Sequence, residues 1–265
     1  LNFLAVAKEL QLFQEIDASF NRQSDPCFKV GNQTWKKDQP RIMGILNITP
    51  DSFYDGGNFF QLDDYGTVAE KMIQAGVDII DIGGESSRPG ALGVTEEEEL
   101  DRILKAVKQI RRRFRIPLSI DTIKPAVADA SLAAGADMIN DISGLAAGRE
   151  MIRIIRRHNA SYCLMHIQGT PDNMQRCPHY DDIIGEIYQF FQSKLKICHD
   201  EDLGKNRILL DPGIGFGKTV LNNMDILNLL PAFSNFDNLI QIGTSNKSFI
   251  GEILQRDLNQ RTSGT

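Results

Sequence analysis

The sequence predicts an α/β fold, namely a (β/α)8 TIM barrel, on three observations. From residue 41 onward, short apolar segments alternate with polar or Gly-rich loops and amphipathic helical segments, which implies parallel strands joined by helical crossovers. The predicted strands are apolar almost throughout, so both faces of the sheet are covered. Polar residues gather where these strands end, as on the active face of a barrel, whereas an open doubly wound sheet concentrates them at one switch point. These polar residues are Asn47, Asp81, Asp121, Asn140, Asp141, His166 and Asp211.

The N-terminal residues differ in character from the rest of the chain. Residues 1–27 are expected to form an N-terminal helical arm or an interdomain linker, because an apolar face repeats there at helical spacing before the polar stretch NRQSDP. This face consists of Leu4, Ala7, Leu10, Phe13 and Ile16. Residues 28–265 are expected to form the barrel domain. It begins with a hairpin over 28–35, which turns at Gly31-Asn32 and would plug the amino end of the barrel.

Seven strand–helix units follow the hairpin. The predicted strands are 42–48, 78–83, 117–121, 137–142, 161–167, 207–211 and 239–243, and the predicted helices are 65–75, 95–114, 124–134, 148–158, 181–200, 222–230 and 247–256. The helix over 95–114 is the best marked, with a predicted capping box of Thr95 and Glu98 and with arginines in its last turn. A closed barrel needs eight units, so we expect that the eighth strand and helix are absent from the given sequence and that the natural chain continues.

Composition limits the classes of function. The 265 residues are 42% hydrophobic, which is enough for a large core, and the net charge of −6 argues against binding to nucleic acid or anionic membranes. No apolar run approaches the roughly 20 residues that a bilayer span needs. The four cysteines are scattered without a CxxC pair, which suits a reducing compartment, so we expect a cytoplasmic protein.

Seven loop motifs together point to one family. In order they are ILNITPDSF (45–53), DIGGESSRPGA (81–91), SIDT (119–122), AGADMINDISG (134–144), LMHIQGTPDNM (164–174), LLDPGIGFGKT (209–219) and IGTSNKSFIG (242–251). This series resembles the dihydropteroate synthases of the pterin-binding TIM-barrel family, over residues 28–265. The resemblance implies a transferase of folate biosynthesis, in which 4-aminobenzoate displaces diphosphate from 6-hydroxymethyl-7,8-dihydropterin diphosphate. It also implies a homodimer, a target of sulfonamides and a dependence on Mg²⁺.

The chemistry of a pterin fits the polar residues at three strand ends. A pterin presents adjacent N–H donors, and a buried carboxylate accepts two such donors well. Asp121 and Asp211 suit that task, while Asn140 both donates and accepts and Lys247 would reach the ring carbonyl or N5. The resemblance adds the apolar walls of this pocket, which are Ile142, Met165, Gly215 and Phe216. The alternative for each aspartate is a helix cap.

The leaving diphosphate calls for positive charge and a metal ion. Mg²⁺ binds through few protein oxygens plus substrate phosphate, and Asn47 is the expected protein ligand. Ser87 and Arg88 would meet phosphate oxygens. The resemblance implies that Phe53 and Pro89 form the walls of the aminobenzoate pocket, with Ser245 near its carboxylate. The expected catalytic residues are Asn47, Arg88, Asp121 and Lys247.

Two departures from the family pattern leave alternatives open. The seventh loop reads Ser245-Asn246-Lys247 where the family has Ser-Arg-Lys, and the family's last strand with its Arg-x-His is not in the sequence. The alternatives are the pterin domain of a methyltetrahydrofolate–corrinoid methyltransferase and a non-catalytic pterin-binding paralogue. An upstream folate-pathway domain fused to the chain is a further expectation.

Two other features are given no catalytic role. GIGFGKT (213–219) lacks the spacing of a phosphate loop, and His166 is expected to be structural.

Overall fold

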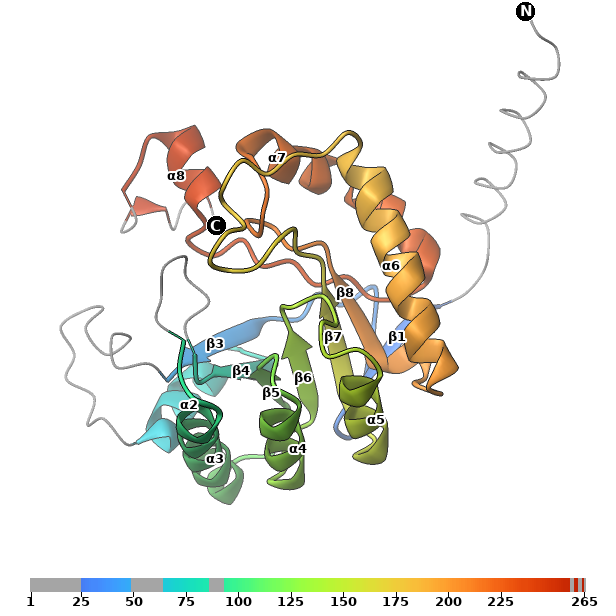
Figure 1. The fold of residues 1–265 in the computed structure, drawn as a ribbon. Helices are drawn as coiled ribbons and strands as arrows, with labels where there is room; N and C mark the ends of the chain where they lie inside the picture. The colour runs from blue at the N-terminus through green and yellow to red at the C-terminus, as the bar shows by residue number, and fades with distance from the viewer. Residues whose placement is uncertain (1–24, 49–63, 86–92, 258–259, 262–263, 265) are drawn as a thin grey trace, which may run out of the picture.

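The computed structural model describes residues 25–48, 64–85, 93–257, 260–261 and 264 (Figure 1). A hairpin of β1 (Cys27–Val30) and β2 (Gln33–Lys36) precedes a parallel sheet of six strands in the order β3-β4-β5-β6-β7-β8. These strands are Met43–Asn47, Ile79–Gly83, Leu118–Asp121, Met138–Asp141, Ser161–Met165 and Ile208–Asp211. Strand order follows chain order, as in a (β/α) barrel and not as in a doubly wound sheet.

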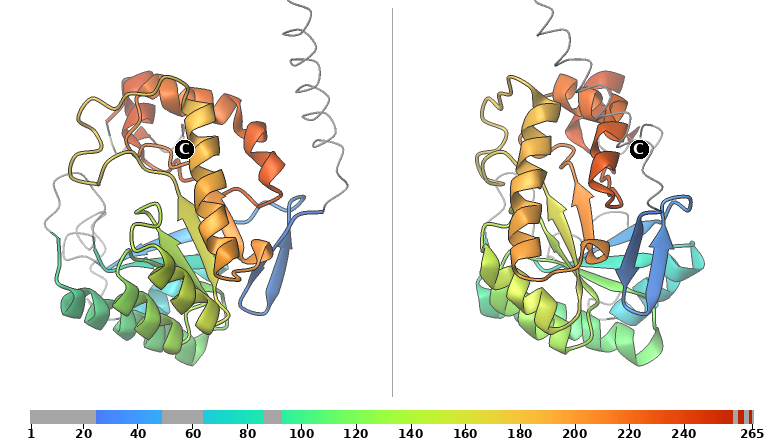
Figure 2. Two further views of the ribbon diagram at one scale, coloured as in Figure 1. Left: turned by 45° about the vertical axis from the view of Figure 1, so that its right-hand side comes forward. Right: turned by 90° about the vertical axis from the view of Figure 1, so that its right-hand side faces the viewer.

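Seven α-helices are described, and they follow one another around the outside of the sheet (Figures 1 and 2). They are α2 (Tyr65–Gln74), α3 (Glu96–Arg113), α4 (Pro125–Ala133), α5 (Arg149–Arg157), α6 (Ile183–Asp200), α7 (Val220–Asn228) and α8 (Ser248–Leu254). Two short 3-10 helices, Lys205–Arg207 and Leu230–Phe236, precede β8 and follow α7. Each α-helix packs against the next, so the units wind in one direction. No described helix is long and apolar enough to cross a membrane.

The predicted strand 239–243 is reduced to one parallel bridge between Leu210 and Ile240. Leu210 N donates to Leu239 O at 3.1 Å, and Gln241 N donates to Leu210 O at 2.9 Å. Among the described residues this segment has β8 beside it but no strand on its other side. At the opposite edge of the sheet, Ile45 of β3 is 55% exposed. The described sheet is therefore open between β3 and residues 239–242.

The hairpin plugs the amino end of the sheet, as the sequence predicts. Phe28, Val30 and Trp35 are buried, and they form a separate apolar cluster with residues at or near the starts of the sheet strands. The strand residues are Ile79, Met138, Cys163 and Leu209, with Met43 partly buried against them. Gly31 adopts φ +53°, so the turn uses the left-handed region that glycine tolerates. The opposite, carboxyl ends of the strands are left for a site.

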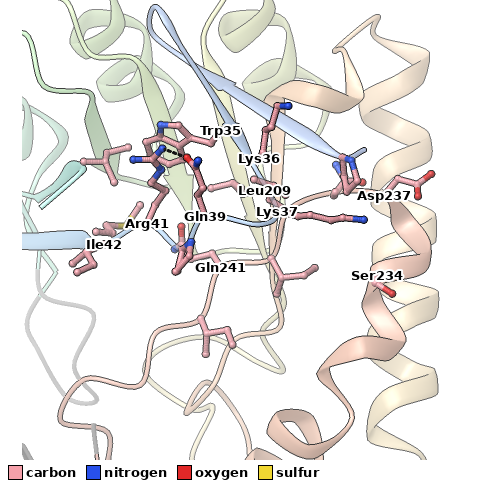
Figure 3. A pocket seen from close by; sticks show the side chains of 18 of the residues that line it. Trp35, Lys36, Lys37, Gln39, Arg41, Ile42, Leu209, Ser234, Asp237 and Gln241 are labelled. Atoms are coloured by element: carbon pink, nitrogen blue, oxygen red, sulfur yellow. Dashed lines mark hydrogen bonds between the residues drawn. The ribbon is translucent and has the colours of Figure 1, made fainter. Parts of the chain in front are cut away.

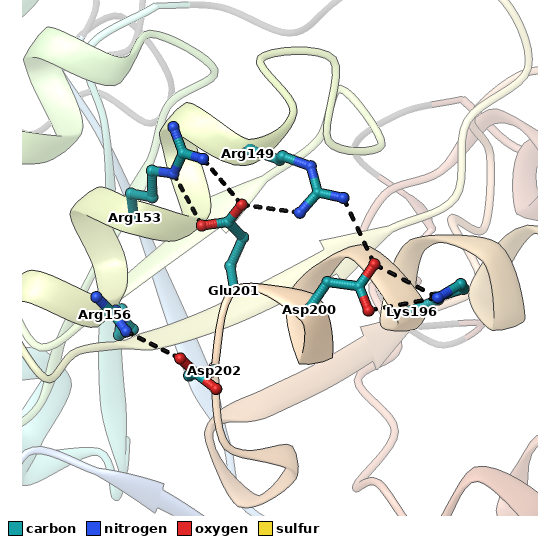
Figure 4. A network of polar contacts seen from close by, with 7 residues as sticks. All are labelled: Arg149, Arg153, Arg156, Lys196, Asp200, Glu201 and Asp202. Atoms are coloured by element: carbon teal, nitrogen blue, oxygen red, sulfur yellow. Dashed lines mark hydrogen bonds and ion pairs between the residues drawn. The ribbon is translucent and has the colours of Figure 1, made fainter.

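Charged residues fasten the outer helices to one another. Glu201, just after α6, accepts hydrogen bonds from Arg149 Nη1 and Arg153 Nε of α5, both at 2.8 Å (Figure 4).

At the start of α3, Thr95 Oγ1 accepts a hydrogen bond from Glu98 N at 3.2 Å. Only this half of the predicted capping box is recorded, and the Glu98 carboxylate instead pairs with Arg102 one turn along the helix.

Candidate active site

Strand register places the predicted polar residues side by side at the carboxyl ends of the sheet. Asn47 of β3 pairs with Gly83 of β4, Gly83 pairs with Asp121 of β5, and Asp121 pairs with Asn140 of β6. Two strands further on, Met165 of β7 pairs with Asp211 of β8. Because side chains alternate along a strand, residues at these matched positions face the same side of the sheet. The structure thus brings together five predicted residues that lie far apart in the sequence, four of them polar.

Gly83 leaves space between Asn47 and Asp121. A Cβ atom at this position would lie 3.1 Å from Asn47 Oδ1 and 3.7 Å from Asp121 Oδ2. The first distance is tighter than an ordinary contact, so a larger residue would push the Asn47 amide away. The missing side chain of Gly83 therefore leaves room for the Asn47 amide and the Asp121 carboxylate on either side of the end of β4.

Asp81 is a site residue that sequence reasoning placed at a strand end but gave no role. It is buried, and its Oδ2 accepts a hydrogen bond from Asn140 Nδ2 at 3.0 Å. This contact orients the amide, so Asn140 Oδ1 is the acceptor that remains. Within the described residues, Asn140 Oδ1 and Asp81 Oδ1 are buried without a hydrogen-bond partner. An unpaired buried acceptor is costly, and a ligand with N–H donors would satisfy it.

Burial and crowding of carboxylates favour the neutral form of the site aspartates. Burial, and then the nearby charges of Asp81, Glu99 and Asp141, raise the pKa of Asp121 well above its usual value. Burial also raises the pKa of Asp211, although Gly213 N donates to its Oδ1 at 2.7 Å. Lys247 opposes both shifts, and burial lowers its own pKa. The site therefore combines two desolvated carboxyls with one desolvated amine.

The loop after β8 supplies an aromatic surface beside the amine. Lys247 Nζ lies 4.0 Å from the centroid of the Phe216 ring, which is cation–π geometry. A Cβ at Gly215 would lie 2.9 Å from Lys247 Cδ, and Gly215 has φ +80°. Glycine is therefore required here both for backbone conformation and for the close approach of the lysine.

A second lysine, Lys218, holds this loop through buried contacts, and sequence reasoning did not single it out. Lys218 is 4% exposed, and its Nζ lies 2.9 Å from Phe216 O and 3.0 Å from His166 Nδ1. Burial lowers the pKa of Lys218 to about 7 and that of His166 to about 3. The histidine thus has a structural partner, in line with its expected structural role. Asp211 faces Lys218 and opposes the shift of the lysine.

Two hollows lie at opposite ends of the sheet. The smaller, about 400 Å³, is lined by Asp121 and Ile142, which are predicted pterin contacts. The larger, about 640 Å³, lies between β3 and residues 239–242, beside the hairpin (Figure 3). There Arg41 Nη2 donates to Gln39 Oε1 at 2.8 Å. The larger hollow lines up with the open edge of the sheet, whereas the smaller one lies at the carboxyl ends beside Asp121. Asn140, Asp211 and Lys247 do not line the smaller hollow.

Part of the predicted site lies outside the described residues, namely Phe53, Ser87, Arg88 and Pro89. Ser245 is described and exposed, two positions before Lys247. Met165 is buried at the end of β7. Asn47 is exposed at the end of β3, and both its amide oxygen and the Asp121 carboxylate lie close to Gly83. A single accessible oxygen donor of this kind fits Mg²⁺, which keeps most of its waters.

Comparison with known proteins identifies the class. Residues 43–265 match the family described as pterin binding enzyme, so the chain belongs to the pterin binding enzymes. More narrowly, it belongs to the dihydropteroate synthases. It is 45% identical to the dihydropteroate synthase of Synechocystis sp. over 225 residues, which covers 84% of this chain and 78% of that relative.

Solved structures of dihydropteroate synthases also resemble this chain in fold and sequence. The structure of Yersinia pestis dihydropteroate synthase with a sulfonamide drug complex aligns with a TM-score of 0.82 and 42% identity, covering 90% of this chain and 86% of that one. The structure of Xanthomonas albilineans dihydropteroate synthase with 4-aminobenzoic acid aligns with a TM-score of 0.82 and 36% identity, covering 91% of this chain and 86% of that one. The fold class predicted from the sequence is confirmed.

Proposed function

We propose that this chain is a transferase that condenses 4-aminobenzoate with 6-hydroxymethyl-7,8-dihydropterin diphosphate and releases diphosphate. The observation that carries the proposal is the set of strand-end residues Asp121, Asn140 and Asp211, with Lys247 near both aspartates. Its support from known proteins is the similarity to dihydropteroate synthases over most of the chain.

The pterin would bind through its polar edge. Asn140 Oδ1, which lacks a partner in the described structure, accepts one N–H, and the carboxyls of Asp121 and Asp211 accept the others. Lys247 lies against the Phe216 ring, so its ammonium is placed over one face of the pocket and would reach the ring oxygen or N5. The hydrogen bonds to a pterin would thus replace the hydrogen bonds to water that these groups lose on burial.

The reaction breaks the C–O bond between the pterin methylene and diphosphate, and the electron pair leaves with the diphosphate oxygen. The amine nitrogen of 4-aminobenzoate then forms a bond to the methylene and loses a proton. Asp121 and Asp211 hold the ring while positive charge develops on the methylene. Burial favours their neutral forms, and a nearby positive charge shifts them towards the ionised forms that stabilise it. Ser87 and Arg88 are proposed to hold the diphosphate, and Phe53, Pro89 and Ser245 the aminobenzoate.

Asn47 is proposed to hold Mg²⁺, with the substrate phosphates as further ligands. When bound, the ion neutralises charge on the leaving diphosphate. The accessible amide oxygen of Asn47 supports this assignment.

A homodimer in the cytoplasm is proposed as the working form. Exposed apolar side chains on two neighbouring helices support the dimer: Leu221 and Met224 of α7 are 74% and 37% exposed, and Ile253 and Leu254 of α8 are 48% and 42% exposed. Light scattering of the purified protein tests it. A monomeric mass at assay concentration would remove the dimer from the account.

The direct test of function is an assay with the pterin diphosphate and 4-aminobenzoate, in which dihydropteroate and diphosphate are measured together. Equal amounts of the two products are expected, with competitive inhibition by a sulfonamide against 4-aminobenzoate. Methyl transfer from methyltetrahydrofolate to a corrinoid would support the methyltransferase alternative. Pterin binding without either reaction would support the non-catalytic alternative.

A further inference from the structure

Lys124 lies just after the strand that carries Asp121. It is the N-cap residue of α4, three positions beyond Asp121, and its backbone N donates to Thr122 Oγ1 at 3.2 Å. Thr122 N in turn donates to Asn140 O at 3.2 Å. The backbone from Asp121 to Lys124 is therefore fixed to β6, and the Lys124 side chain starts from a defined point next to the site.

The ammonium group of Lys124 joins three separate parts of the chain. Nζ lies 2.7 Å from Glu85 Oε2, 2.6 Å from Glu99 Oε2 and 2.9 Å from Val94 O. Glu85 follows β4, and Val94 precedes α3, so these two contacts lie on either side of residues 86–92. One side chain thus holds both the start and the end of the second βα loop.

A second cation acts on the same loop. Arg102 Nη1, from the second turn of α3, donates to Gly84 O at 2.8 Å. Both ends of the loop are therefore tied by charge-assisted hydrogen bonds, which are shorter and stronger than neutral ones. Glu85, Gly93 and Glu99 also line the 400 Å³ hollow together with Asp121, so the tied ends form one wall of it.

Neutralising a buried charge is the simpler role for Lys124, but it does not account for all three contacts. Glu99 is 1% exposed, and a carboxylate so deeply buried needs a cation. Burial lowers the pKa of Lys124, but the hydrogen bonds to Glu85 and Glu99 outweigh burial and raise it, so the lysine is charged. One contact to Glu99 would satisfy that need. The contacts to Glu85 and to Val94 O lie on the loop.

We propose that Lys124 is a positioning residue for the synthase reaction, which fixes both ends of the second βα loop against the strand that carries Asp121. The proposal rests on the proposed function, because this loop includes Ser87, Arg88 and Pro89, the expected contacts of diphosphate and aminobenzoate. It assigns Lys124 no contact with substrate. Its role is to hold Glu85 and Val94, which lie on either side of residues 86–92, beside the strand that carries Asp121.

The test compares variants that loosen the loop with variants that only disturb charge. Lys124→Met and Glu85→Gln are both expected to lower kcat/KM by about tenfold or more, the size of one charge-assisted hydrogen bond. The Kd of 6-hydroxymethylpterin, which lacks diphosphate, is expected to stay unchanged by calorimetry. Lys124→Arg keeps the charge and is expected to recover part of the lost kcat/KM. Lys205→Met, at a surface lysine paired with Asp237, is the matched control and is expected to leave kcat/KM unchanged.

A double variant separates positioning from neutralisation. Lys124→Met leaves Glu99 buried without its cation, and Lys124→Met with Glu99→Gln removes that charge. The double variant is expected to recover the urea midpoint of unfolding but not kcat/KM. Recovery of both, or wild-type kinetics for Glu85→Gln, would mean that Lys124 serves only to neutralise Glu99 and would overturn the inference. A wild-type protein that forms no dihydropteroate would instead refute the proposed function.

Discussion

Replacing Lys218 by methionine is expected to flatten the pH dependence of stability above neutral pH. The lysine is 4% exposed at the base of the loop that carries Gly215 and Phe216, and burial lowers its pKa from 10.5 to about 7. The neighbouring Lys247 lowers it further, while Asp211 opposes the shift. Methionine has a similar length and flexibility but does not titrate.

The sign follows from the protons bound in each state. Between pH 7 and 10.5 the unfolded lysine is protonated and the folded lysine is not, so the unfolded state binds the extra proton. The free energy of unfolding therefore rises with pH in this window, by up to about 1.4 kcal/mol per pH unit. Below pH 7 the lysine is protonated in both states, and its contribution is constant and least favourable. From pH 7 to 9 the expected gain is about 2 kcal/mol.

Urea unfolding at pH 7, 8 and 9 measures this gain as the difference between wild type and Lys218→Met, which cancels the titration of distant groups. The difference is expected to change by about 2 kcal/mol across the series, with unchanged m-values. Lys196→Met, at a lysine whose side chain is 76% exposed, is the control and should run parallel to wild type. Parallel curves for Lys218→Met as well would refute the account of a desolvated amine under the loop.

Three further changes test separate parts of the structure. Gly83→Ala is expected to lower synthase kcat/KM by about tenfold, because the added Cβ displaces the Asn47 amide. The urea midpoint of unfolding should not change. A wild-type kcat/KM would mean that the position of the amide does not matter. Trp35→Ala removes the largest side chain of the hairpin plug and should cost about 3 kcal/mol of unfolding free energy. The pterin Kd of this variant should be unchanged, since the site lies at the other end of the strands, and a large change in Kd would contradict that separation. Asn47→Ala should shift the Mg²⁺ titration of activity to higher concentration, and an unshifted titration would remove Asn47 from its assigned role.

The sequence allows the fold and part of the site to be predicted because both depend on local patterns. Apolar strands between amphipathic helices predict the six parallel strands in chain order, and residues at strand ends predict that Asp121, Asn140 and Asp211 face one region. The predicted strand 239–243 is reduced to one bridge beside β8, and apolar composition alone does not reveal how many ladder hydrogen bonds a segment makes.

Interactions between distant residues could not be predicted in this way. The contact of Asp81 with Asn140 depends on the register of strands that are 59 residues apart. Lys218 meets His166 only after the loop folds back over the end of β7, and Lys124 meets Glu85 across two strand ends. In the sequence, each of these lysines is an ordinary surface-type residue in a loop. Only the structure shows that Lys218 is buried and that Lys124 is shared among three partners.

The central claim is that the strand-end carboxyls of Asp121 and Asp211 hold a pterin at the carboxyl end of the sheet. Calorimetric titration of 6-hydroxymethylpterin into wild type and Asp121→Asn tests it most directly, with Asp225→Asn as an exposed control. The amide of Asp121→Asn keeps the shape, but its NH2 group can only donate hydrogen bonds where a carboxylate oxygen accepts them. Losing a hydrogen bond to a charged group should raise the Kd about tenfold or more, while the control matches wild type. An unchanged Kd for Asp121→Asn would contradict the claim and leave Asp121 with no more than a structural role.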